Sequence, residues 1–152
     1  MNKIISSRDF DFYKLEDKKL DIRYVGEIAN GFPAQSDDFV QEIIDLNKVL
    51  IKHPEATILG RAKGLSNYPL INPGDFFVID KAEEWLHNEL AICFVDGEFA
   101  AKWIEKVNNK LFLVPFSDDF PVIDMNKANN VSIWGIVTWI LHKPNVRPRR
   151  LQ

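Results

Sequence analysis

The chain has 152 residues, of which 46% are apolar and 27% are charged. This composition excludes a disordered protein, and the length fits one globular domain with a peripheral segment. A net charge of −3 argues against generic nucleic-acid binding by phosphate neutralisation. The single cysteine, Cys93, excludes an intramolecular disulfide and fits a reducing cytosol. With no signal peptide and no apolar run of about 18 residues, we expect a cytoplasmic protein that does not contact a membrane.

The first thirty residues have the pattern of an N-terminal arm. A charge-dense stretch at 14–21 leads into alternating apolar and polar residues at 20–24, which is typical of a short half-buried strand. Asn30-Gly31 follows as a turn signal, with Pro33 close behind it. Two interpretations are open: an extended arm that can leave the domain, or an ordinary first strand and turn.

Residues 36–50 form the only strong helical pattern in the sequence. Apolar side chains from Phe39 to Leu50 recur on one face, and Ser36 is a suitable N-cap. We expect this helix to end before Pro54 and to pack on the core of its own domain.

From Ala56 onward the pattern favours β-structure. Asp96-Gly97 lies between two apolar runs and is a strong signal for a two-residue hairpin turn, because both positions need positive φ. Asn108-Asn109 is a second, weaker turn signal, and the basic tail at 143–152 is expected to be extended. The expected strands are residues 57–62, 76–80, 89–95, 98–107, 110–115 and 130–142.

Few residues in this sequence can carry chemistry. The three histidines are far apart and have no metal-ligand spacing, so we expect no metal and no cofactor. Cys93 lies within an apolar strand, where a thiol is usually inert. Ser66 remains, in a turn next to Gly64, and a serine nucleophile needs a base. Lys102 lies on a strand with small and apolar neighbours that can lower its pKa by desolvation; an ordinary turn serine and an edge lysine are the alternative interpretation.

Several segments, taken in order, give the chain a resemblance to the UmuD-like members of the LexA-type self-cleaving serine peptidases. They run from about Asn30 to His142, and the combination is more specific than any one of them. The segments are NGFP at 30–33, IDLNKVLIKHP at 44–54, PGDFFVID at 73–80, VDGEFAAK at 95–102 and WGIV at 134–137.

The resemblance implies a role for four residues. Ser66 takes the place of the nucleophile, Lys102 that of the base, and Asn30 and Gly31 those of the two residues on either side of the cut. The implied fold is a mostly β domain like the LexA/UmuD C-terminal domain, with one short N-terminal helix and an extended arm. The arm is then residues 1–30, the peptidase and dimerisation domain 31–142, and the basic tail 143–152.

The resemblance also implies partners and a pathway. They are a second copy of the chain, a RecA filament on single-stranded DNA that stimulates self-cleavage, and a UmuC-like Y-family DNA polymerase in the SOS response. Thirty residues without a two-helix pattern cannot supply a helix-turn-helix, so no sequence-specific DNA binding is expected. Leu65 and Asn67 depart from the family's G-D-S-M pattern. A non-cleaving dimeric adaptor of a DNA polymerase is therefore the alternative hypothesis.

Overall fold

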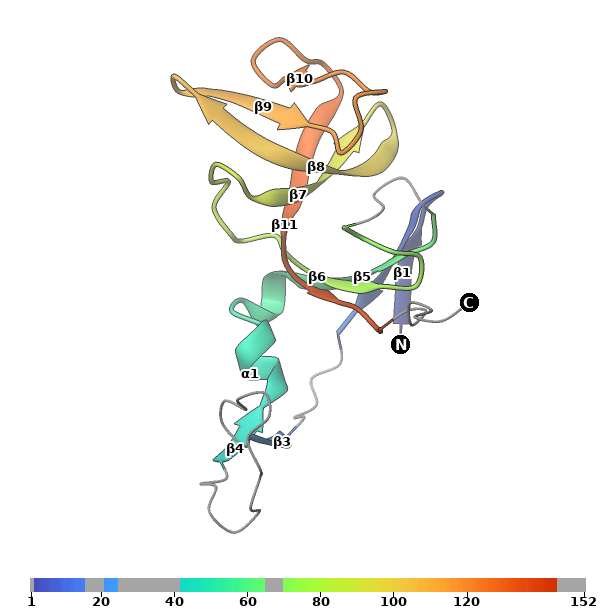
Figure 1. The fold of residues 1–152 in the computed structure, drawn as a ribbon, viewed down its shortest axis with the longest axis vertical. Coiled ribbons are helices and arrows are strands. Elements are labelled where there is room, and N and C mark those ends of the chain that lie inside the picture. The colour runs from blue at the N-terminus through green and yellow to red at the C-terminus, as the bar shows by residue number, and fades with distance from the viewer. Residues whose placement is uncertain (1, 16–20, 25–41, 65–69, 145–152) are drawn as a thin grey trace, which may run out of the picture.

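The computed structural model describes residues 2–15, 21–24, 42–64 and 70–144 (Figure 1). Nine strands form one antiparallel sheet in the order β1-β2-β5-β6-β11-β7-β8-β9-β10, and β3 and β4 form a separate two-stranded ribbon. The strands are β1 (Asn2–Ser6), β2 (Phe10–Lys14), β3 (Asp21–Tyr24), β4 (Glu42–Asp45), β5 (Thr57–Ala62), β6 (Phe76–Asp80), β7 (Leu90–Val95), β8 (Glu98–Val107), β9 (Lys110–Val114), β10 (Ile123–Asp124) and β11 (Val131–Leu141); the helical turns are α1 (Leu46–Leu50) and the 3-10 turn η1 (Pro54–Ala56).

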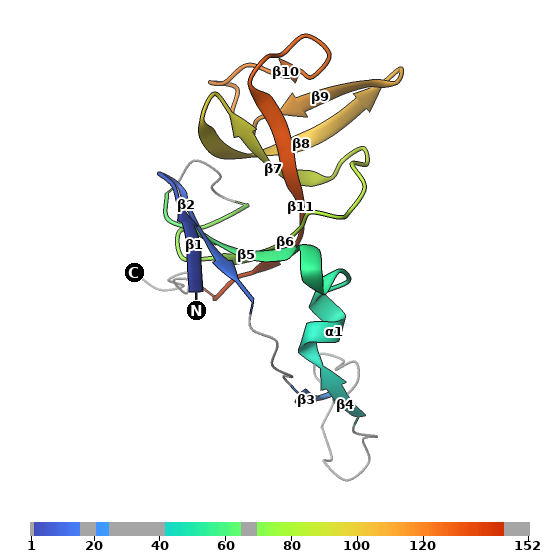
Figure 2. The ribbon, with the colours of Figure 1, turned by 180° about the vertical axis from the view of Figure 1, so that it is seen from behind.

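The long strand β11 joins two parts of the sheet. Its first half pairs with β7 and its second half with β6, and the register shifts between Ile133 and Gly135 and again between Val137 and Trp139. Such bulges bend a strand, and Figures 1 and 2 show β11 curving from the β7–β10 region down to β5 and β6. Gly135 allows the close approach there, since a Cβ on it would lie 2.5 Å from Ile79 Cγ2.

Two apolar clusters line the two faces of the sheet. Alternate residues of β7 contribute to each: Leu90 and Ile92 to one, Ala91 and Cys93 to the other. The first cluster is the larger and also contains Phe10, Phe12, Ala62, Ile71, Phe77, Ile79, Ala101 and Val137. The second also contains Ile104, Leu113, Ile133 and Ile136.

The mostly β fold class and the expected strands are confirmed, to within about one residue at each end. The two hairpin turns have the positive φ that their residues predicted: 49° at Asp96 and 87° at Gly97, then 51° at Asn108 and 63° at Asn109. These turn signals depend only on the residues of the turn itself, so they do not depend on contacts with the rest of the chain. Four of the described strands were not expected: β1, β2, β4 and β10.

Of the predicted helix at 36–50, the structure describes residues 42–50, where the prediction is confirmed for 46–50 and wrong for 42–45. Residues 42–45 form β4, paired with β3, and α1 covers only Leu46–Leu50. Asp45 caps this helix by accepting a hydrogen bond from the Asn47 backbone N–H at 3.0 Å, whereas the predicted cap Ser36 lies outside the described residues. Strand pairing thus overrode the helical periodicity. No helix in the described ranges is long and apolar enough to cross a membrane.

The first two strands of the predicted arm, β1 and β2, belong to the main sheet. β1 pairs with β2, and β2 pairs with β5, so both strands continue the main sheet. Phe10 and Phe12 are 1% and 0% exposed and belong to the larger cluster. β3 lies where the short strand at 20–24 was predicted. Removal of residues 1–30 by a cut at Asn30-Gly31 stays a prediction, because both residues lie outside the described ranges.

Candidate active site

Lys102 is held in the middle of the β7–β8 hairpin. It lies opposite Ala91, and the Asp96-Gly97 turn fixes this register. The residue is only 8% exposed. Within the described part of the chain, its ammonium has neither an ion pair nor a hydrogen bond. It faces the Phe120 ring, whose centre is 5.9 Å from Nζ.

The surroundings of Lys102 favour its neutral form. Burial lowers the pKa of Lys102 below its usual range, since removing an ammonium from water disfavours its charge. A thiolate at Cys93 would oppose this shift. However, burial raises the pKa of Cys93 to about 12, so the thiol is neutral at physiological pH and gives Lys102 no counter-charge. The prediction that Cys93 is a buried thiol is confirmed.

A cavity of about 280 Å³ opens beside Lys102. Its walls come from β8, from the segment that follows β9, and from the turn between β1 and β2. This size is enough for a few residues of an extended chain and too small for a large cofactor. The lining residues are Arg8, Asp9, Val95, Glu98, Phe99, Ala100, Ala101, Lys102, Pro115, Phe116, Ser117 and Phe120.

Ser66 lies outside the described residues, but the structure describes Lys63 and Gly64, which begin its loop. The backbone N–H of Lys63 donates to the Asp9 carbonyl at 2.8 Å. A Cβ placed on Gly64 would lie 2.7 Å from Asp9 Oδ1. Since Asp9 also lines the Lys102 cavity, the loop that carries Ser66 leaves β5 at the edge of that cavity. Sequence reasoning missed Arg8 and Asp9, which no catalytic pattern marks.

A second hydroxyl, that of Ser117, also lines the cavity. Its Oγ donates to Asp119 Oδ2 at 3.0 Å and accepts from the Asp119 backbone N–H at 3.1 Å. Both bonds hold a turn, so this serine has a structural role and is a useful control for Ser66.

Asp75, just before β6, and Asp80, its last residue, each pair with a histidine from a distant part of the chain. His142 Nδ1 lies 2.8 Å from Asp75 Oδ1, and His53 Nδ1 lies 2.6 Å from Asp80 Oδ2. Spacing in the sequence cannot reveal such pairs, because the fold alone brings the partners together. Both aspartates are buried, at 5% and 2% exposure, so the pairs anchor the two ends of the strand.

His53, Asp80 and Glu83 place three potential metal ligands within 4.8 Å of one another. Asp80 is already engaged with His53 and with the Ala82 backbone N–H, which donates to it at 2.8 Å. Glu83 pairs with Lys52 at 2.9 Å. The potential ligands of this cluster are therefore already engaged in contacts within the protein. These contacts connect the start of η1 to the end of β6.

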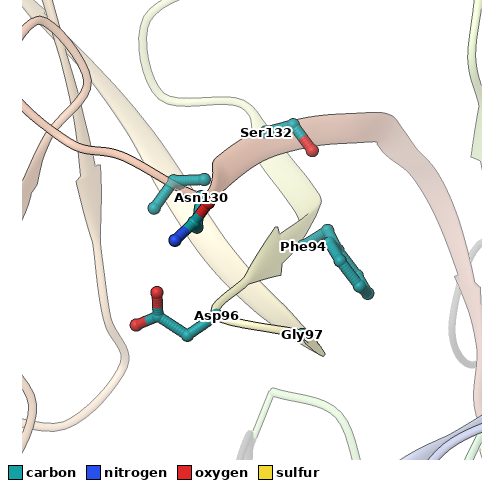
Figure 3. A pocket seen from close by; sticks show the side chains of 6 residues that line it. Phe94, Asp96, Gly97, Asn130 and Ser132 are labelled. Carbon is teal, nitrogen blue, oxygen red and sulfur yellow. The ribbon is translucent and has the colours of Figure 1, made fainter.

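A hollow of about 530 Å³ lies away from Lys102, at the β7–β8 turn and the start of β11. Figure 3 shows Phe94 and Asp96 pointing in different directions from this turn. The Asp96 backbone N–H donates to the Asn130 carbonyl at 3.0 Å, which ties the turn to β11. The described lining of this hollow offers one carboxylate, Asp96, and no lysine or histidine, so the Lys102 cavity is the better candidate for chemistry.

The fold and the sequence together define a class. The chain belongs to the Peptidase S24-like family, which matches residues 23–138 and makes it a serine peptidase by family. It is 35% identical to Protein ImpA of Salmonella typhimurium over 114 residues, which are 74% of this chain and 77% of ImpA. Protein SamA of Salmonella typhimurium strain LT2 is 33% identical (74% and 79% covered), and Protein MucA of Escherichia coli is 30% identical (76% and 80%). Within the family it is UmuD-like, as the resemblance predicted.

Proposed function

We propose that this protein cuts its own chain between Asn30 and Gly31, with Ser66 as nucleophile and Lys102 as base. Neutral Lys102 takes the proton of Ser66 Oγ, which attacks the carbonyl carbon of Asn30. Backbone N–H groups of the Ser66 loop stabilise the oxyanion. The C–N bond then breaks, Lys102 returns the proton to the Gly31 amine, and water hydrolyses the ester to release the Asn30 carboxylate.

The observation that supports this proposal is the state of Lys102. A buried lysine without a counter-ion is unfavourable for stability, because its charge loses hydration and gains no partner. Such an arrangement is useful for a general base, which has to be neutral before it accepts a proton. The cavity beside it offers room for an extended substrate segment.

The substrate is tethered to the enzyme, which raises its effective concentration and allows a slow site to act. Asn30-Gly31 lies in the connection between β3 and β4, and Figures 1 and 2 show this ribbon at the opposite end of the molecule from β8–β10. Self-cleavage within one chain therefore needs residues 25–41 to reach from β3 and β4 to the Lys102 cavity, and the cavity of a second copy is the alternative.

The test is the intact mass of the pure protein after incubation between pH 7 and pH 10, with and without an activated RecA filament. We expect a fragment that starts at Gly31 and forms faster as pH rises, since a larger fraction of Lys102 is then neutral. Ser66→Ala and Lys102→Ala should abolish it. Two control variants should still form the fragment. Ser117→Ala removes the second hydroxyl of the cavity, and Lys106→Ala removes an exposed lysine on β8, the strand of Lys102. Identical fragments from the wild type and Ser66→Ala would contradict the proposal.

In the cell, we propose a cytoplasmic homodimer that acts in the SOS response. A RecA filament on single-stranded DNA stimulates the cut, and the shortened chain is then a subunit of an error-prone, UmuC-like translesion DNA polymerase. The family and its UmuD-like relatives support this context. The test is a pull-down of the polymerase with two baits, the shortened chain that starts at Gly31 and the uncut Ser66→Ala chain. Equal recovery of the polymerase with both baits would show that binding does not need the cut.

That last result would favour the alternative, a non-cleaving dimeric adaptor of a DNA polymerase. One structural observation favours it: β1 and β2, within residues 1–30, are built into the main sheet. The two functions differ in the fate of the chain after DNA damage, when the adaptor stays intact and the peptidase does not.

A further inference from the structure

The β1–β2 hairpin is part of the core, although it precedes the residues that match the family, which begin at Arg23. The Phe12 ring lies 4.8 Å from the centres of both the Phe99 and the Trp134 rings, and the Phe10 ring lies 5.4 Å from that of Phe77. These partners come from β8, β11 and β6, all after Asn30-Gly31. The hairpin therefore packs mainly against residues that follow Asn30-Gly31. After a cut there, those residues would belong to the C-terminal fragment and the hairpin to the N-terminal one.

Backbone and charged contacts add to this packing. β2 pairs with β5 at five successive positions, from Phe10 opposite Ala62 to Lys14 opposite Ile58. Lys63 Nζ lies 3.0 Å from Asp11 Oδ1 and donates to Ser6 Oγ at the same distance. Edge strands held by a full ladder and buried rings leave a sheet only when the core opens.

The proposed cut also falls between two paired strands. β3 precedes Asn30-Gly31 and β4 follows it, and the two strands pair at four positions. A cut there opens one connection of the chain and breaks none of the strand pairs on either side. In the described part of the product, two strand pairings then join the fragments, β2 with β5 and β3 with β4.

We propose that residues 1–30 stay bound to the rest of the chain after a cut at Asn30-Gly31, as a separate subunit whose hairpin completes the sheet. Its turn remains one wall of the Lys102 cavity, through Arg8 and Asp9. The shortened chain thus has its own N-terminal fragment as a further partner. This inference rests on the proposed function only for the position of the cut. The cut itself can be made with an added protease, without any activity of Ser66.

The experiment uses the full Ser66→Ala chain with a recognition sequence for a site-specific protease inserted between Asn30 and Gly31. The folded protein is cut, diluted to micromolar concentration and passed over a sizing column, and each fraction is weighed under denaturing conditions. We expect both fragments in one fraction at the elution volume of the uncut protein. An N-terminal fragment in a later fraction of its own would overturn the proposal. Because an added protease makes the break, a chain that does not cut itself gives the same result.

Two substitutions in the β1–β2 hairpin test whether the buried ring of Phe12 holds the N-terminal fragment in place. Phe12→Ala removes a fully buried ring and should weaken binding of the fragment by about a hundredfold or more. Ile4→Ala, on the 47% exposed Ile4 of β1, is the matched control and should change it by less than about threefold. Equal release from both variants would contradict the role of the buried ring.

A third substitution covers the case in which Phe12→Ala does not fold. Lys63→Gln lies in the larger fragment and removes the charge that pairs with Asp11. We expect about tenfold weaker retention of the fragment, and more so at low salt, where the pair is least screened. Retention that is the same as in the parent chain at low and high salt would show that this contact does not hold the fragment.

Discussion

Two hairpins meet at the Lys102 cavity, and they are built by different means. The β7–β8 turn relies on two residues with positive φ, Asp96 and Gly97. The β1–β2 turn has no such residue; the Ser7 side chain closes it by donating to the Phe10 carbonyl at 2.9 Å and accepting from the Phe10 N–H at 3.1 Å. The first hairpin is specified locally, whereas the second is held by what it packs against.

This difference separates the two parts of the candidate site. The hairpin that carries Lys102 has its own register and turn, so its side chain is placed by local geometry. The hairpin that closes the cavity with Arg8 and Asp9 depends on distant aromatic rings and on Lys63. Substitutions at matched positions of the two hairpins can test whether that contrast holds.

The largest expected effect is that of Phe12→Ala on the free energy of unfolding. Removing this fully buried ring leaves a cavity against Phe99 and Trp134, and we expect a loss of about 3–5 kcal/mol. Phe94→Ala, on the 39% exposed ring of β7, should lose about 1 kcal/mol or less. Urea denaturation of both variants measures this, and equal losses would remove the contrast between the hairpins.

A smaller effect is expected from Asp11→Asn. The hydrogen bond from Ser6, followed by those from Lys63 and Lys3, lowers the pKa of Asp11 from 3.8 to about 2. The carboxylate therefore stabilises the fold above about pH 4, and this contribution is lost as the pH falls toward 2. At pH 7 we expect Asp11→Asn to lose about 1–2 kcal/mol, since water partly screens the exposed lysines.

The matched control for Asp11→Asn is Asp96→Asn in the other hairpin, where asparagine tolerates the positive φ. It should change the free energy of unfolding by about 0.5 kcal/mol or less. Unfolding of each variant at pH 7 and pH 3 checks both statements. An Asp11→Asn loss that is as large at pH 3 as at pH 7 would show that its charge is not the cause.

The smallest expected effect has the opposite sign and comes from Lys102→Met. Burial lowers the pKa of Lys102, so between that pKa and about 10.4 the unfolded chain binds a proton that the folded chain does not. Stability then rises with pH in that window, and the unfavourable burial of the charge is greatest below it. We expect Lys102→Met to be more stable than the wild type at pH 7, with a difference that shrinks toward pH 10.

Lys106→Met is the control for Lys102→Met, because Lys106 is exposed on the same strand. Thermal unfolding between pH 7 and pH 10 should show no comparable change with pH for this variant. A constant difference between Lys102→Met and the wild type over that range would mean that Lys102 titrates as it does in the unfolded chain.

The sequence by itself determined the elements whose signals are local. The strands β5–β9 and β11 alternate or run apolar. The turns at Asp96-Gly97 and Asn108-Asn109 carry residues that accept positive φ, so the pairing of β7 with β8 and of β8 with β9 follows from short-range geometry. Lys102 could be singled out in the same way, since a strand alternates its faces and places this lysine among small and apolar neighbours.

Only the tertiary structure decided what is built from distant segments. It turned residues 42–45 of the predicted helix into β4 and kept helix only at Leu46–Leu50, because pairing with β3 outweighs a local preference. It placed Phe10 and Phe12 in the core and set Asp9 beside Gly64. Burial of a short strand depends on partners that come later in the chain, and no window of residues contains both.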